Sequence, residues 1–149
     1  MSFPPRVESF LEDLSLFTER QERFQVLIEF ADRFREVPAE LAQRPFPESH
    51  HVQRCDSEAF IWCEPLPDGT FKYYFAVENP QGISAKFMAV MLDETLSGED
   101  PQEVLKLTPD IVYSIFGKEL SMGKGQGLMG MVELLKALTR RALISLEQT

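Results

Sequence analysis

Apolar residues recur at helical spacing near both ends of the chain and alternate like strand residues in the middle. The spacing predicts a helix over residues 4–17 and a second one over 19–35. Further along, it predicts a buried helix over 83–96 and a long last helix over 125–145. The apolar stripe of the second helix would consist of Phe24, Leu27, Ile28, Ala31 and Phe34.

The central pattern predicts an antiparallel hairpin. Residues 58–64 and 70–78 are rich in aromatic and β-branched residues, and the turn-forming run 65–69 joins them. Ahead of the hairpin, residues 38–51 contain three prolines and two histidines, which indicates an extended loop. Between the hairpin and the last helix, Asp100 and Thr108 each precede a proline and so mark two short helix starts.

This order of elements, with no alternation of strand, helix and strand, predicts an α+β fold. We expect one domain over residues 1–149, with a small antiparallel sheet of about three strands covered on one side by helices. Glu103 is spaced to complete a capping box with Asp100 at the first of the short helices.

Composition and charge narrow the classes of function. The net charge of −9 argues against nucleic-acid binding, because phosphate affinity comes from clustered Lys and Arg. No window approaches the roughly 18 apolar residues of a membrane span, and the N-terminus lacks the pattern of a secretion signal. We therefore expect a cytoplasmic protein that does not act at a membrane.

The chain has only two cysteines, Cys55 and Cys63, and without an export signal we expect both to be reduced. Cys63 alternates with Ile61 and Ala59 in the first strand, which favours a small buried side chain. A disulfide between the two would require the chain to fold back, because an extended strand separates their Cα atoms by more than about 7 Å.

Cys55 lies in the run Val52-Gln-Arg-Cys-Asp-Ser57, between the proline-rich loop and a strand. Such loops are usually exposed, and the neighbouring Arg54, His50 and His51 would favour a reactive thiolate, whereas Asp56 would oppose it. On these local features a functional thiol and an incidental loop cysteine both remain open.

Other chemistry is less well supported. The two histidines and two cysteines lack the paired spacing of a zinc site, so we expect no metal. The cysteine and histidines would also match a Cys-His-Asp hydrolase, but so loosely that many other sequences would match it as well. The glycines of residues 123–127 lack the order of a phosphate-binding loop. They indicate either a flexible start of the last helix or a loop that brings Lys124 and backbone N–H groups towards the thiol.

Four segments, in matching order and at matching distances, resemble one known family. They are Glu22–Phe30, Val52–Ser57 around the cysteine, Asp100–Val104, and Leu120–Leu128 followed by Met131. Together they resemble the SufE family, the sulfur acceptors that partner cysteine desulfurases in iron–sulfur cluster assembly. The chain departs from the family pattern at Arg54, where the family has glycine, and at Lys124, where it has arginine.

The resemblance implies a SufE/IscU-like fold and a sulfur relay. Cys55 would accept persulfide sulfur from a pyridoxal-phosphate-dependent cysteine desulfurase, stimulate that enzyme, and pass the sulfur to an Fe–S scaffold. Arg54 and Lys124 would stabilise the thiolate or persulfide, Ser57 would position the loop, and Gln126 would hydrogen-bond nearby backbone. The protein would need no cofactor of its own and would not be a stand-alone enzyme.

Two further expectations accompany the resemblance. The thiol would rest in an apolar cavity, so that the partner has to draw the loop out. The alternative function is a non-catalytic interaction module that keeps the fold and binds a desulfurase or scaffold without accepting sulfur.

Overall fold

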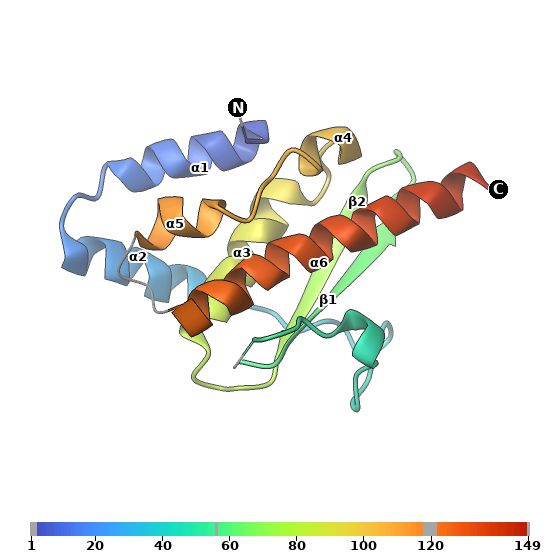
Figure 1. Ribbon diagram of the computed structural model, residues 1–149, viewed down its shortest axis with the longest axis horizontal. Coiled ribbons are helices and arrows are strands. Elements are labelled where there is room, and N and C mark those ends of the chain that lie inside the picture. Colours follow the sequence, from blue (N-terminus) through green and yellow to red (C-terminus); the bar gives the residue numbers. More distant parts are fainter. Residues whose placement is uncertain (1–2, 56, 118–121, 149) are drawn as a thin grey trace.

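The computed structural model describes residues 3–55, 57–117 and 122–148, the side chains of 122–124 excepted. Its elements follow the order that the hydrophobic pattern predicts (Figure 1). In chain order they are α1 (Pro5–Ser15), α2 (Arg20–Asp32), the short 3-10 helix η1 (Glu48–His50), β1 (Ala59–Pro65), β2 (Phe71–Val77), α3 (Ile83–Leu96), α4 (Pro101–Val104), α5 (Ile111–Phe116) and α6 (Met122–Glu147).

The sheet is an antiparallel pair in which Ala59 lies opposite Val77 and Pro65 opposite Phe71. The α+β fold with a small antiparallel sheet is confirmed. About three strands were expected, whereas the described residues form two strands and one isolated bridge from His51 to Phe60. The bridge does not extend because η1 directly precedes it and the chain then turns away into the loop that carries Cys55.

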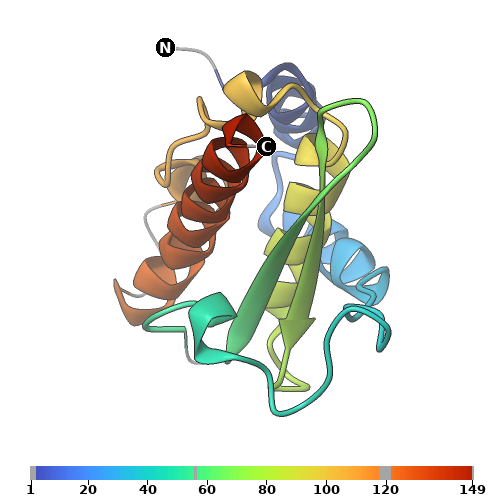
Figure 2. The ribbon, with the colours of Figure 1, turned by 90° about the vertical axis from the view of Figure 1, so that its right-hand side faces the viewer.

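Helices cover one face of the sheet, as expected. Helix α3 packs along β2 and α6 along β1, while α1 and α2 lie beyond α3 (Figures 1 and 2). Strand β2 can face this layer because its alternate side chains are all large and apolar. On β2 the buried residues of this face are Phe71, Tyr73, Phe75 and Val77.

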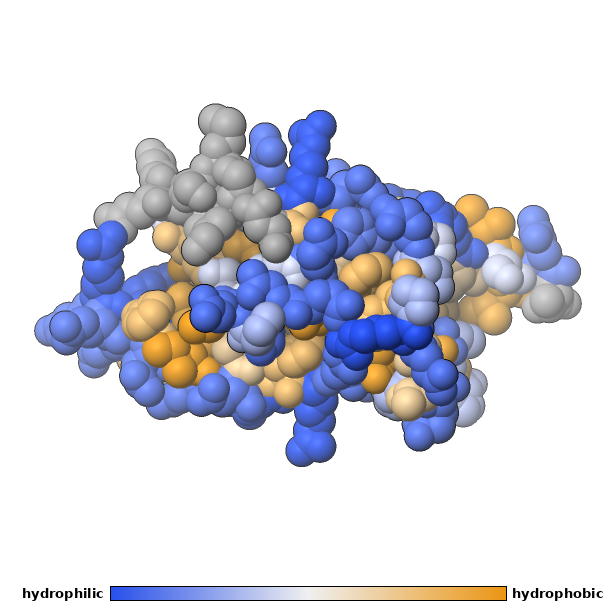
Figure 3. Space-filling model, turned by 90° about the horizontal axis from the view of Figure 1, so that it is seen from below, coloured by the Kyte–Doolittle hydropathy of each residue, from blue (hydrophilic) through white to orange (hydrophobic). Residues whose placement is uncertain are grey.

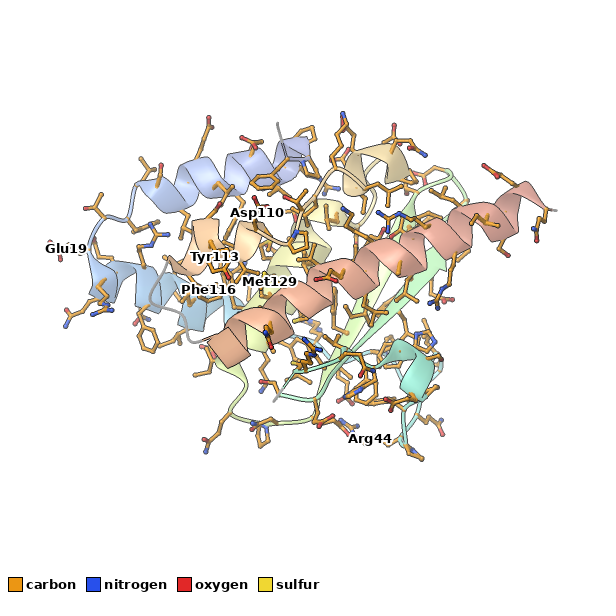
Figure 4. The ribbon with its side chains drawn as sticks, viewed as in Figure 1. Glu19, Arg44, Asp110, Tyr113, Phe116 and Met129 are labelled. Carbon is orange, nitrogen blue, oxygen red and sulfur yellow. The ribbon has the colours of Figure 1, made fainter. Side chains whose placement is uncertain are left out.

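The opposite face is covered by the proline-rich segment of residues 37–46. Phe60, Trp62 and Ala76 point to this side and form a second, smaller core with Val37. Arg44, labelled in Figure 4, fastens the segment through ion pairs with two carboxylates, those of Glu36 and Glu78. The segment thus acts as a second covering layer, which allows a sheet of only two strands to bury both faces.

Hydrogen bonds occupy several backbone groups along the edge of β2 that faces away from β1. The N–H of Val37 donates to the carbonyl of Phe75 at 2.8 Å, and the N–H of Gly98 donates to the carbonyl of Phe71 at 2.9 Å. Between them, the N–H of Tyr73 donates to Oγ of Ser97 at 3.0 Å. These contacts satisfy backbone groups that an edge strand would otherwise expose.

Of the two predicted starts of short helices, the one at Asp100 is confirmed, whereas α5 begins at Ile111, after Asp110 rather than after Thr108. The Asp100 carboxylate accepts a hydrogen bond from the N–H of Gln102 at 2.9 Å and so caps α4. The expected capping box does not form, because the N–H of Asp100 donates to the carboxylate of Glu99 at 3.3 Å and Glu103 pairs with Lys106 at 2.7 Å. Within the part of the chain that is described, no helix has the length and apolar character needed to cross a membrane.

Candidate functional site

The segment of residues 52–58, called the Cys55 loop below, projects from the end of the sheet as a tight reversal. Its base is closed where the N–H of Val52 donates to the carbonyl of Ala59 at 2.8 Å, next to the bridge between His51 and Phe60. Inside the loop, the N–H of Glu58 donates to the carbonyl of Cys55 at 3.0 Å. The thiol is therefore carried by irregular backbone that starts and ends at fixed points of the sheet.

Two residues of the Cys55 loop adopt left-handed backbone without being glycine. The φ angle is 61° at Arg54 and 53° at Glu58. For an L-residue this conformation costs roughly 1–2 kcal/mol. At Arg54 it explains why the family pattern has glycine there: the turn before the cysteine needs positive φ, and glycine adopts positive φ without a side-chain penalty.

Helix α6 provides a close-fitting support for the Cys55 loop. A Cβ atom added to Gly127 would lie 2.9 Å from the carbonyl oxygen of Arg54 and 3.0 Å from Cα of Cys55. One turn further on, a Cβ atom at Gly130 would lie 3.1 Å from the carbonyl oxygen of Gln53. The two glycines lie on the same side of the helix, so they let the loop backbone rest directly on the helix surface.

A third glycine supports the other side of the loop. A Cβ atom added to Gly82, just before α3, would lie 2.7 Å from Oγ of Ser57. The carbonyl of Ser57 accepts a hydrogen bond from the N–H of Asn79 at 3.1 Å, and that of Glu58 accepts one from the N–H of Glu78 at 3.0 Å. The Cys55 loop is thus held between the start of α6 and the turn that follows β2.

Cys55 is buried, with 8% of its surface exposed. The local expectation of an exposed thiol is therefore wrong, because the glycines of α6 let the loop sink against the helix. The side chain borders a cleft of about 350 Å³ whose walls come from α2, α3, α6 and the turn after β2. The cleft is lined by Phe24, Leu27, Cys55, Ser57, Asn79, Gln81, Gly82, Ile83, Ser84, Ala85, Gly127 and Leu128.

The candidate site residues predicted from the sequence differ in how exposed their side chains are. Arg54 is exposed and directly precedes Cys55 in the chain, Ser57 is half-buried in the same loop, and Gln126 is exposed on α6 next to the glycine whose backbone approaches Cys55. The side chain of Lys124 and the whole of Asp56 fall outside the described residues. The structure thus brings Arg54, Cys55, Ser57 and the start of α6 together.

The two histidines are engaged away from the thiol. The ring of His50 stacks on Trp62, with centroids 5.2 Å apart, and its Nδ1 lies 2.8 Å from the carbonyl oxygen of Ile61. Nε2 of His51 lies 2.6 Å from a carboxylate oxygen of Glu58. Over residues 3–55, 57–117 and 122–148, no three His, Cys, Asp or Glu side chains gather as metal ligands would.

Cys63 sits in a different environment from Cys55. It lies half-buried on the helix-covered face of β1, and neither cysteine is part of a disulfide. Burial raises the pKa of the Cys63 thiol to about 11, although hydrogen bonds with Thr139 and Tyr73 counteract part of that rise. Near neutral pH it is therefore protonated and a poor nucleophile.

Sequence reasoning missed the supporting role of the glycines and misplaced one aromatic residue. Phe24, assigned to the buried stripe of α2, is 55% exposed, and Ile83 at the start of α3 is 41% exposed. Both lie at the cleft beside Cys55. Figure 3 shows apolar surface between polar side chains on one face of the molecule. The three-residue spacing of Gly127 and Gly130 was the signal that could have revealed the supported loop.

Similar proteins are found among family models and solved structures. The family model described as "SufE: Fe-S metabolism associated domain" matches residues 8–139. A solved structure, described as the solution structure of a hypothetical protein from Thermus thermophilus, superposes with a TM-score of 0.76 at 28% sequence identity. That match covers 96% of this chain and 99% of the other. A search of curated proteins finds no match. The chain therefore belongs to the SufE family of domains associated with Fe–S metabolism.

Proposed function

We propose that the protein accepts sulfur on Cys55 from the persulfide of a pyridoxal-phosphate-dependent cysteine desulfurase, stimulates that enzyme, and passes the sulfur to an Fe–S scaffold. The observation that carries this proposal is the position of Cys55. The thiol lies on a short irregular loop at the end of the sheet, seated on glycines and next to a cleft. Membership of a family associated with Fe–S metabolism supports it.

The proposed transfer is a thiol exchange. The Cys55 thiolate attacks the outer sulfur of the desulfurase persulfide, a new S–S bond forms at Cys55, and the old S–S bond breaks. The electron pair of the broken bond leaves with the desulfurase cysteine, which takes up the proton that Cys55 gave up. One thiol and one persulfide exchange places, so no external oxidant or reductant is needed.

The burial of Cys55 implies that the partner controls this step. A thiol that is 8% exposed cannot reach a sulfur on another protein unless the Cys55 loop moves outwards. The loop can move without breaking the β1–β2 ladder, because its residues lie outside both strands. Resting burial would shield the sulfur from solvent thiols, and docking of the desulfurase would expose it.

Residues around the thiol have roles that follow from their positions. The exposed guanidinium of Arg54 is adjacent in sequence to Cys55 and would favour the thiolate and the persulfide anion. Lys124 would add a second cation from α6, Ser57 would hold the loop against Gly82, and Gln126 would serve the same loop from the helix. The exposed side chains of Phe24 and Ile83 offer an apolar contact for the desulfurase beside the thiol.

The alternative, a non-catalytic interaction module, is favoured by the same burial of Cys55, because docking alone would not require an exposed thiol. Sulfide release by a cysteine desulfurase separates the two functions when wild type is compared with Cys55→Ser. Stimulation by wild type alone, together with the added mass of a sulfur atom on Cys55, would support acceptance. Equal stimulation by the serine variant would refute it.

The proposed compartment is the cytoplasm, where thiols are kept reduced. In that setting the protein acts as a partner of the desulfurase rather than as an enzyme by itself.

A further inference from the structure

The base of the Cys55 loop carries a polar contact that the sulfur-transfer chemistry does not use. Nε2 of His51 lies 2.6 Å from Oε2 of Glu58, so the two side chains at the base of the loop are joined. His51 precedes the loop and Glu58 is its last residue. The contact therefore spans the loop just where its two ends meet.

The two partners differ in how firmly they are held. The His51 side chain is only 17% exposed, its ring lies 4.9 Å from that of Phe60, and its backbone pairs with β1. The Glu58 side chain is 58% exposed, and its backbone is in the left-handed region with φ of 53°. His51 is held through both its ring and its backbone, whereas Glu58, whose carbonyl accepts from the N–H of Glu78, has an exposed side chain that can leave the contact when the loop moves.

Glu58 also transmits this contact to the cysteine. Its N–H donates to the carbonyl of Cys55 at 3.0 Å, while its carboxylate faces His51. Swinging the thiol outwards changes the backbone around Cys55 and so acts on Glu58. Loosening Glu58 removes one restraint on that movement.

We infer that His51 is a positioning residue that keeps the Cys55 loop closed through Glu58, so that this pair sets how often the thiol is exposed before any partner binds. The importance of the pair for sulfur transfer rests on the proposed function, but its effect on the exposure of Cys55 does not. Releasing either partner raises the population of open loop, and with it the rate at which an external reagent reaches the sulfur.

The test is the rate at which a bulky maleimide modifies Cys55 in the intact protein, with Cys63 followed in the same sample by peptide mass spectrometry. His51→Phe retains a ring against Phe60 but removes both ring nitrogens, and Glu58→Gln removes only the charge. Each change is expected to raise the Cys55 rate about three- to tenfold, in keeping with one partly exposed charged hydrogen bond. The double variant is expected to match His51→Phe, because without the ring nitrogens the charge at position 58 no longer has a contact to weaken.

Two controls decide the interpretation. Glu48 lies on the other side of the His51 ring, with Oε1 3.3 Å from Nδ1, but outside the Cys55 loop, so Glu48→Gln should leave the rate within about twofold of wild type. Cys63 reports general loosening of the sheet, and its rate should stay constant.

The inference is overturned if both single variants react like wild type, if Cys63 accelerates equally, or if Glu48→Gln has the effect of Glu58→Gln. If His51→Phe fails to fold, as judged by its thermal melt, the exposed Glu58→Gln change carries the test alone. No desulfurase enters the assay, so its outcome is independent of whether Cys55 accepts sulfur.

Discussion

Replacing Gly127 with alanine tests whether α6 supports the closed Cys55 loop. The new methyl group would lie 2.9 Å from the carbonyl oxygen of Arg54 and 3.0 Å from Cα of Cys55. Both are backbone atoms, so no side chain can rotate aside to make room. Either the helix or the loop has to shift.

The magnitude follows from two opposing effects. Alanine stabilises a helix interior by about 1 kcal/mol relative to glycine, whether the loop is open or closed. The overlap destabilises only the closed loop, by about 1–3 kcal/mol if it resembles other overpacked sites. Because a factor of ten corresponds to about 1.4 kcal/mol, the open population should rise about 5- to 150-fold. The helix gain offsets about 1 kcal/mol of the overlap, so the free energy of unfolding should fall by only about 0–2 kcal/mol.

The assay combines two measurements on the same variant. The maleimide reaction rate of Cys55 reports the open population, and chemical denaturation reports the free energy of unfolding. Gly130→Ala is the matched control, since its Cβ would be 3.1 Å from the nearest loop atom and should produce a smaller acceleration. If Gly127→Ala stabilises the protein by about 1 kcal/mol and leaves the Cys55 rate unchanged, the loop does not rest on the helix as described.

Three further predictions concern separate parts of the structure. Arg54→Gly should raise the free energy of unfolding, measured by chemical denaturation, by about 0.5–1 kcal/mol. The strain relieved in the left-handed backbone exceeds the conformational entropy that glycine adds to the unfolded chain. A lower free energy of unfolding than that of wild type would contradict this. Phe24→Ser should weaken desulfurase stimulation about fivefold at subsaturating concentration, whereas Leu16→Ser, which is 78% exposed but away from the cleft, should leave it unchanged. The pKa of Cys63 is raised from about 8.5 in an unfolded chain to about 11, so the folded state holds its proton more tightly and loses stability as pH rises across that interval. Between about pH 8.5 and 11, the free energy of unfolding measured by urea titration should therefore fall less for Cys63→Ala than for wild type. An equal fall in the two proteins would contradict the burial of Cys63.

Much of the fold could be predicted because the helices and strands repeat their buried apolar residues with a regular period. The inner face of α6, which includes Leu128, Met131 and Leu135, repeats at helical spacing, and those residues are buried. The alternation in β2 likewise places Phe71, Tyr73, Phe75 and Val77 on one face of the strand, and in the structure that face packs against the helices. What the pattern could not show is that residues 37–46 cover the second face of the sheet, because prolines break both periodicities.

The candidate site was harder to predict, because its geometry depends on contacts between distant segments. The sequence places Cys55 in a polar run, which indicates exposure, yet Gly127 lies far along the chain and lets the loop sink. Phe24 fits the apolar stripe of α2, but its side chain remains exposed at the cleft. Periodicity states which face of an element is apolar and says nothing about whether a neighbour covers it.

The hydrogen bonds along the free side of β2 bear on how a partner can bind. Val37, Ser97 and Gly98 already occupy backbone groups of that strand, so an incoming peptide would have to displace them before it could pair along its length. Along this edge a partner would then be recognised by surface side chains rather than by backbone pairing. Contacts of that kind form and dissociate without rearranging the sheet. A carrier that must release one protein before meeting the next would benefit from such short-lived complexes.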